Sequence, residues 1–271
     1  GTMVLPDDLF TIGAYAFSNS NAASVVFGNS LTTIDDYAFS GCSSLSCELH
    51  LPSSLTSIGN RAFQNCNLTG RLILPDSLQI LKESAFASAG SFNGDLIIPE
   101  GITRLYGYTF FTTEFTGSLI LNNVIEFGKY IFNGEELGCD FYGCGFSGQL
   151  VIPEGVIELT KRTFYKCNFS SVVFPSTLKR INKDVFSDNN FSDELVFPDG
   201  FVSIGENAFS GCNGITALTF PSSMQTVGPK AFMGCFGISN ITSSAIEPPT
   251  VQSGAFDGVA KDNFTVEVPA Q

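Results

Sequence analysis

The decapeptide SIGNRAFQNC, Ser57–Cys66, recurs as SIGENAFSGC at Ser203–Cys212, with six of ten positions identical. Its Ala-Phe centre, with close variants, occurs along the whole chain at intervals of 22 to 24 residues with one exception. The central phenylalanines are Phe17, Phe39, Phe63, Phe86, Phe110, Phe132, Phe164, Phe186, Phe209, Phe232 and Phe256. A fixed period of this length is typical of a solenoid, in which each repeat buries its apolar face against its neighbours. The decapeptide is therefore interpreted as part of a structural unit and not as a duplicated site.

Prolines set the register of the repeat, because eight of them lie eleven residues before a central phenylalanine. They are Pro6, Pro52, Pro75, Pro99, Pro153, Pro175, Pro198 and Pro221. The segment before the proline alternates with period two, as in GRLILP and GDLIIP, which predicts a short strand that ends at the proline. A second short extended segment and a turn or two of helix around Ala-Phe complete the predicted unit.

The interval from Phe132 to Phe164 breaks the period. Residues upstream of it fit a repeat centred on Phe132, whereas residues downstream fit a repeat centred on Phe141. The two centres differ by nine residues. We interpret residues 133–141, NGEELGCDF, as an insertion that protrudes from the middle of the solenoid.

The recurring motifs Leu-x-Leu-Pro, Leu-x-x-Ile-Gly and Ala-Phe-x-x-Cys resemble the leucine-rich repeats of the BspA-like family. The resemblance covers essentially the whole chain, and residues 245–271 look like the degenerate terminal repeat of that family. It implies an α/β-type leucine-rich repeat fold: one right-handed, horseshoe-like, β-rich solenoid over residues 1–271, with short strands, short helical turns and about eleven repeats. It also implies a secreted or surface-anchored protein with an adhesive or host-interaction role.

The charge of the chain argues against some classes of partner. It carries 26 acidic and 13 basic residues, a formal charge of −13. Such a chain is repelled by nucleic-acid phosphates and anionic lipid, so nucleic-acid binding is not expected. No apolar run approaches the ~20 residues of a membrane-spanning helix, so membrane insertion of this segment is not expected either. We expect a monomeric extracellular or cell-surface protein, with a signal peptide or lipid anchor outside this sequence.

Residue types that support catalysis are sparse. His50 is the only histidine, so a two-histidine metal site cannot form and a histidine-based triad could form only around it. No P-loop, nucleophile elbow or dinucleotide-binding glycine motif is present. Glu135 and Glu136 in the insertion are the acids best placed to act as a carboxylate pair, although a solvated loop is the simpler interpretation. We predict no catalytic residue, no cofactor and no metal, with a carboxylate-based hydrolase as the least favoured alternative.

Cysteines recur three residues after a central phenylalanine, at Cys42, Cys66, Cys144, Cys167, Cys212 and Cys235, where Cys144 follows Phe141. Their repetition predicts a buried column of small apolar side chains, because zinc sites need close pairs of cysteine or histidine. Cys139 and Cys144 are the pair to test for a disulfide.

One set of strand residues is expected to face solvent. Residues one and three positions before each proline are bulky and apolar and should lie in the core, so the residue between them should point outward. Across nine repeats this residue is Val26, His50, Ile73, Ile97, Ile120, Val151, Val173, Val196 and Thr219. Two explanations remain open: β-branched residues are good strand formers, or the stripe binds a protein. The polar residues on its rim are Ser24, Glu48, Arg71, Asp95, Ser118, Gln149, Ser171 and Glu194.

A second surface feature is aromatic. The residue after the central phenylalanine is Phe111, Tyr142 and Tyr165 in the middle repeats, and Tyr106, Tyr108 and Tyr130 fall close by. Exposed aromatic residues often mark binding sites, but these residues could instead pack under the insertion. We predict a non-catalytic module that binds a protein or carbohydrate through the apolar stripe or these aromatic residues, with an architectural spacer as the alternative.

Overall fold

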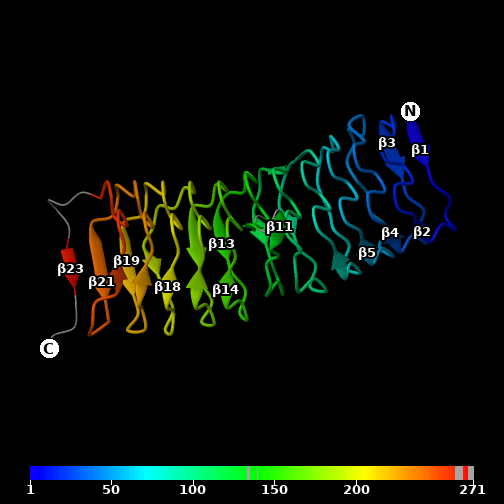
Figure 1. The fold of residues 1–271 in the computed structure, drawn as a ribbon. Helices are drawn as coiled ribbons and strands as arrows, with labels where there is room; N and C mark the ends of the chain where they lie inside the picture. The colour runs from blue at the N-terminus through cyan, green and yellow to red at the C-terminus, as the bar shows by residue number, and fades with distance from the viewer. Residues whose placement is uncertain (133–134, 139, 260–264, 268–271) are drawn as a thin grey trace. The chain divides into compact units, whose positions relative to one another are not determined.

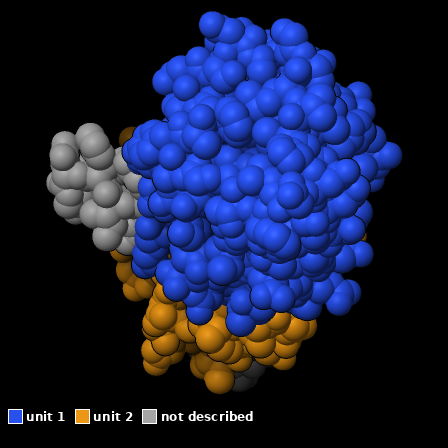
Figure 2. All heavy atoms as spheres, turned by 90° about the vertical axis from the view of Figure 1, so that its right-hand side faces the viewer, with its two compact units in different colours: residues 1–146 blue, residues 147–271 orange. Residues whose placement is uncertain are grey.

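The computed structural model describes residues 1–132, 135–138, 140–259 and 265–267, with backbone alone for residues 130–132, 135–137 and 265–267 (Figure 1). The chain forms two compact units, Gly1–Phe146 and Ser147–Gln271, which are blue and orange in Figure 2. Each unit is a stack of short coils whose strands, apart from one antiparallel pair in unit 1, pair in parallel with the strand one repeat away.

The first extended segment of each repeat, which ends at a proline in most repeats, forms the first-strand face of each unit. In unit 1 these are β1 (Thr2–Val4), β3 (Ser24–Val26), β8 (Leu96–Ile97) and β10 (Leu119–Ile120), with a parallel bridge between Leu49 and Leu72. In unit 2 they are β13 (Gln149–Val151), β15 (Ser171–Val173), β17 (Leu195–Val196), β19 (Ala217–Phe220), β21 (Asn240–Ser243) and β23 (Thr265–Glu267). The pairing places the same repeat position of successive coils side by side, as with Ile97 and Ile120. The predicted strands before proline are confirmed.

The second extended segment of each repeat forms the second-strand face. In unit 1 it comprises β2 (Thr11–Ile12), β4 (Thr33–Ile34), β5 (Ser57–Ile58) and β6 (Ile80–Leu81). In unit 2 it comprises β14 (Glu158–Leu159), β16 (Arg180–Ile181), β18 (Ser203–Ile204), β20 (Thr226–Val227) and β22 (Thr250–Val251). A further parallel pair in unit 1 joins β7 (Ser91–Phe92) to β9 (Glu114–Phe115). The glycine that often follows the second strand has a steric reason, because a Cβ on Gly59 would lie 2.5 Å from the backbone nitrogen of Asp36 in the preceding coil.

The central phenylalanines form the core of both units. Phe39 and Phe63 stack with ring centroids 5.3 Å apart and planes 2° from parallel, and Phe63 stacks on Phe86 at 5.2 Å. Unit 2 has a column of its own, in which Phe209 and Phe232 stack at 5.3 Å and 4°. These rings are almost fully removed from solvent, so each of these repeats contributes one aromatic ring to the stack of its own unit.

The Ala-Phe segment does not form the short helix that the sequence predicts, since the described residues contain strands and turns but no helix. The residues two before and two after the central phenylalanine, such as Arg61 and Asn65 around Phe63, have φ of 53° and 55°. Left-handed residues cannot continue a right-handed helix. Instead, the backbone amides of every second residue in the segment donate hydrogen bonds to the next coil. The amides of Phe63 and Asn65, for example, donate to the carbonyl oxygens of Ala85 and Ala87 at 2.8 and 3.0 Å.

Residues three positions after the central phenylalanine form a donor column. The thiols of Cys42, Cys66, Cys144, Cys212 and Cys235 donate to the carbonyl oxygens of Phe17, Phe39, Phe110, Phe186 and Phe209, at 3.0 to 3.3 Å. Thr113 and Asn189 occupy the same repeat position and donate to Phe86 and Phe164 in the same way. The predicted burial of these cysteines is confirmed, and the column also satisfies backbone carbonyls, a role that the sequence interpretation missed.

The irregular interval contains an antiparallel pair, β11 (Tyr130–Phe132) and β12 (Glu135–Leu137). Eleven residues separate Gly128 from Asp140, whereas only two separate the equivalent Gly59 and Ala62 of a regular repeat. The extra length therefore lies between the second extended segment and the central phenylalanine. Phe141 stacks on Phe110 at 5.5 Å and therefore belongs to the core column. Of the expected insertion 133–141, residues 133, 134 and 139 lie outside the described residues, as does most of the tail of the expected terminal repeat.

Candidate functional site

The described residues offer few groups of the kinds that support catalysis or metal binding. His50 lies exposed on the first-strand face, and no three His, Cys, Asp or Glu side chains of the described part are grouped closely enough to hold a metal ion. The side chains of Glu135 and Glu136 fall outside the description.

Two cysteines of the donor column, Cys212 and Cys235, are poor nucleophiles. Burial raises the pKa of the Cys235 thiol to about 12 and raises the pKa of Cys212 well above its usual range. Because the thiolate is the reactive form, these side chains are inert at neutral pH. Their role is structural.

Alkylation of the folded protein is expected to modify half-buried Cys47 at least roughly tenfold faster than Cys212 and Cys235, which combine burial with raised pKa values. Iodoacetamide labelling at pH 8, followed by peptide mass spectrometry, measures each rate. Labelling in urea is the control, since unfolding should make the rates similar. Equal rates in the folded protein would show that the column opens readily.

The predicted apolar stripe is exposed in unit 1. Val26, Ile73, Ile97 and Ile120 leave between 41 and 58% of their side chains in solvent, although each lies between two buried residues of its strand. Val4 occupies the same repeat position and is 70% exposed, so it extends the stripe by one coil. The prediction omitted Val4, although its place two residues before Pro6 could have revealed it.

Unit 2 carries its own stripe at the same repeat position. Val151, Val173 and Val196 are 51, 44 and 56% exposed, and Thr219 follows them. The structure thus places all six predicted aliphatic residues, Ile73, Ile97, Ile120, Val151, Val173 and Val196, at the surface of a first-strand face.

The second-strand face shows whether strand propensity alone can account for the aliphatic stripe on the first-strand face. Its extended segments pair in parallel as those of the first-strand face do, yet their outward residues are mostly polar: Thr11, Thr33, Ser57, Ile80, Arg104, Glu126, Glu158, Arg180, Ser203, Thr226 and Thr250. Threonine shows that a strand former at this position does not have to be aliphatic. A general need for β-branched residues therefore does not explain why the first-strand face is aliphatic and the second-strand face is not.

Charge is distributed unevenly between the two faces. The ion pairs of the described residues lie on the second-strand face and the adjoining Ala-Phe segments, for example Arg104 with Glu126 and Lys183 with Glu206. The residue after each proline borders the stripe and is often acidic, as at Asp7, Asp76, Glu100, Glu154 and Asp199. This acidic edge was not predicted, although aligning the repeats on their prolines would have shown it.

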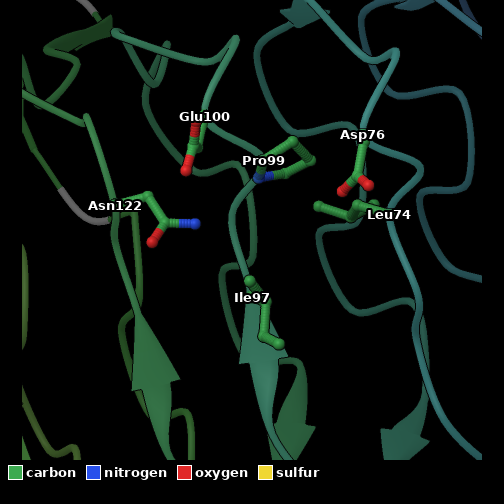
Figure 3. Close-up of a pocket in the computed structure, with 6 residues that line it drawn as sticks. All are labelled: Leu74, Asp76, Ile97, Pro99, Glu100 and Asn122. Carbon is green, nitrogen blue, oxygen red and sulfur yellow. The ribbon is translucent and has the colours of Figure 1, made fainter.

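A depression of about 360 Å³ lies where the stripe of unit 1 meets its acidic edge. Leu74, Pro99 and exposed Ile97 provide its apolar lining, and Asp76 and Glu100 provide carboxylates on either side of Pro99 (Figure 3). Asn122 completes the lining and donates its side-chain amide to the carbonyl oxygen of Ile98 at 2.7 Å. Within the described part of the chain, neither carboxylate has a cationic group within 4 Å.

The structure brings together some of the predicted aromatic residues. Phe111 contacts Tyr108 at 4.7 Å and Tyr142 at 5.0 Å between ring centroids, and all three are half-buried in unit 1. Tyr106 is separate from this cluster in its contacts, since its ring lies under Arg104 at 5.1 Å.

Tyr165 belongs to unit 2, where Arg162 and Lys166 lie over its ring at 5.9 and 5.3 Å. The side chain of Tyr130 lies outside the description. A binding role for the aromatic residues stays a prediction, because none of these contacts identifies a ligand.

The stacked coils, the phenylalanine core and the proline register define a repeat that matches a known sequence family. The model of the BspA type leucine rich repeat region, in six copies, matches residues 10–138 and 139–261. The chain belongs to the BspA-type leucine-rich repeat family. The resemblance inferred from the repeat motifs is thereby confirmed, and the described strands give the BspA-type repeat its solenoid form.

Solved structures support the BspA-type fold. A leucine-rich repeat protein from Bacteroides ovatus is 19% identical, with a TM-score of 0.57 over 90% of this chain. The pneumococcal vaccine antigen PcpA is 18% identical, with a TM-score of 0.53 over the full chain. The chain spans 55% of the Bacteroides ovatus protein and 74% of PcpA. No curated protein matches the sequence.

In the residues that the structure describes, the BspA-type repeat contains no helix of the length and hydropathy needed to span a membrane.

Proposed function

We propose that this chain is a non-catalytic protein-binding module of a bacterial cell-surface or secreted protein, and that the stripe of unit 1 contacts the partner. The observation that carries the proposal is the difference between the two faces: the outward positions of the first are mostly aliphatic, whereas those of the second are mostly threonine, serine and charged residues. Membership of the BspA-type family supports the extracellular location.

The physical basis is the cost of leaving the stripe in water. Each Å² of apolar surface covered by a partner contributes about 25 cal/mol to association, before the costs of ordering are subtracted. Ile73, Ile97 and Ile120 stand in successive coils of unit 1 and are 58, 50 and 41% exposed. A contiguous apolar patch of this kind commonly marks an interaction site in a soluble protein.

Replacing Ile73, Ile97 and Ile120 together by threonine is expected to weaken partner binding at least roughly tenfold, because threonine keeps the branched Cβ and removes much of the apolar surface. The matched control is Ile80→Thr, since Ile80 is also an exposed strand isoleucine, 43% exposed, but lies on the second-strand face. Binding of both proteins to arrays of extracellular-matrix proteins and glycans provides the measurement, with urea unfolding to confirm intact folding.

A ligand that binds the triple variant and the wild type equally would show that the stripe is not the binding site. If no arrayed ligand binds the wild type, the result favours the architectural spacer over the binding module.

A further inference from the structure

We propose that the partner segment recognised by unit 1 combines aliphatic and basic side chains, and that a lysine or arginine side chain enters the depression between Asp76 and Glu100. This inference rests on the proposed function and specifies the chemistry of the partner. It identifies a class of polypeptide segment and not a particular protein.

The volume and the lining of the depression suit one long amphipathic side chain. Its volume of about 360 Å³ lies near the lower end of the range for ligand pockets, about 300–1,000 Å³. Leu74, Ile97 and Pro99 supply apolar surface for the methylene groups of a lysine or arginine, and Asp76 and Glu100 supply negative charge for its tip. Side chains of this kind place their stems on apolar surface and keep the charged end in polar surroundings.

An extended partner segment could contact the stripe and the depression together. Ile97 and Pro99 lie two residues apart along the course of β8. Side chains two residues apart in an extended chain point to the same side, with a spacing of about 6.6 Å. A partner running along this direction would place an aliphatic side chain on Ile97 and its second neighbour in the depression.

Charge complementarity selects a basic partner. The residues that follow the prolines in unit 1 include the acids Asp7, Asp76 and Glu100 and no base, and the chain as a whole carries −13. Arg71 is the basic residue on the rim of this stripe. A second copy of the chain packed face to face would bring two acidic edges together, which is unfavourable, whereas a basic segment neutralises the edge.

The test uses three end-blocked, fluorescently labelled peptides and the full chain. The basic peptide is Val-Ser-Val-Ser-Lys-Ser-Lys, which presents valine and lysine on one side when extended. In the acidic peptide glutamate replaces lysine, and in the polar peptide serine replaces valine. Fluorescence anisotropy, with the chain titrated to millimolar concentration, measures the affinities at low and high salt.

We expect the basic peptide to bind at least roughly tenfold more tightly than the acidic peptide, and more weakly as salt rises. The Asp76→Asn/Glu100→Gln chain should bind the basic peptide roughly five- to tenfold more weakly than the wild type. The matched control is Glu126→Gln/Glu206→Gln, which removes the same number of charges from carboxylates that pair with bases elsewhere.

Several outcomes would overturn the inference. These are absence of binding by the basic peptide, equal binding of the basic and acidic peptides, or an unchanged affinity in Asp76→Asn/Glu100→Gln. Equal binding of the basic and polar peptides would remove the aliphatic requirement. A wild type that sediments as a dimer, with the threonine triple variant monomeric, would show that a second copy covers the stripe.

Failure of the inference can be distinguished from failure of the proposed function. If the threonine triple variant loses an arrayed ligand but the Asp76→Asn/Glu100→Gln chain does not, the stripe binds a partner that lacks the basic side chain. If the triple variant binds every ligand as the wild type does, the proposed function itself is wrong.

Discussion

Replacing Phe86 by alanine is expected to lower the free energy of unfolding of unit 1 by about 3–5 kcal/mol. The Phe86 side chain is fully buried and stacks on Phe63 at 5.2 Å and on Phe110 at 5.8 Å. In a solenoid each repeat is stabilised mainly by its two neighbours, so one cavity in the column weakens both interfaces of the coil. For a unit of this size the melting temperature should fall by roughly 10 °C or more.

Urea unfolding followed by circular dichroism measures this loss, and two further variants calibrate it. Phe10 is 64% exposed, so Phe10→Ala should change the unfolding free energy by no more than about 0.5 kcal/mol. Phe17 stacks on Phe39 at the N-terminal end of the column and is half-buried, so Phe17→Ala should give an intermediate loss. A loss at Phe86 no larger than that at Phe10 would mean that the column does not hold the repeats together.

The sequence was sufficient to predict the coil but not its turns. Proline and the central phenylalanine recur because each coil repeats the backbone path of the last, so the strands and the inward residues could be inferred by spacing. The left-handed conformation of Tyr37 and Arg61 could not, because such residues are uncommon at positive φ. It is stabilised by hydrogen bonds between coils, such as that from the Arg61 amide to the Glu83 carbonyl, which no local pattern predicts.

The candidate site also has a part that could be predicted from the sequence and a part that could not. The exposure of Ile97 and its equivalents follows from alternation along one strand and was predicted from sequence. The depression depends on where Asp76 of one coil lies relative to Glu100 of the next, so it needed the structure. Asn189 lies three residues after Phe186, at the repeat position of the column cysteines, and the structure places it in the core with its side-chain amide donating to the Phe186 carbonyl oxygen.

The stability of unit 1 is expected to depend on pH through Asp140. Asp140 occupies the position held by alanine in Ala-Phe and is fully buried beside the inserted hairpin. Its Oδ1 accepts hydrogen bonds from the Gly107 amide at 2.9 Å and the Thr109 hydroxyl at 3.2 Å, and its Oδ2 accepts one from the Gly128 amide at 3.1 Å. The carboxyl group therefore joins the coil before the insertion to the two ends of the inserted segment.

Burial raises the pKa of Asp140 from 3.8 to about 6, although the three hydrogen bonds act in the opposite direction. The folded state thus binds the proton more tightly than the unfolded state between about pH 4 and pH 6. Stability consequently falls as the pH rises through this window, by about 3 kcal/mol in total for this group. The sign is opposite to that of a paired carboxylate such as Asp36, whose pKa is lowered.

Asp140→Asn isolates this contribution, because asparagine resembles the protonated acid in shape and does not titrate. Urea unfolding of both proteins between pH 4 and pH 7.5 gives the difference in unfolding free energy at each pH, in which the effects of all other groups cancel. We expect the variant to gain about 2.5 kcal/mol relative to the wild type as the pH rises across this range. A constant difference, or a relative gain by the wild type, would show that the hydrogen bonds from Gly107, Thr109 and Gly128 outweigh burial and keep the carboxylate charged.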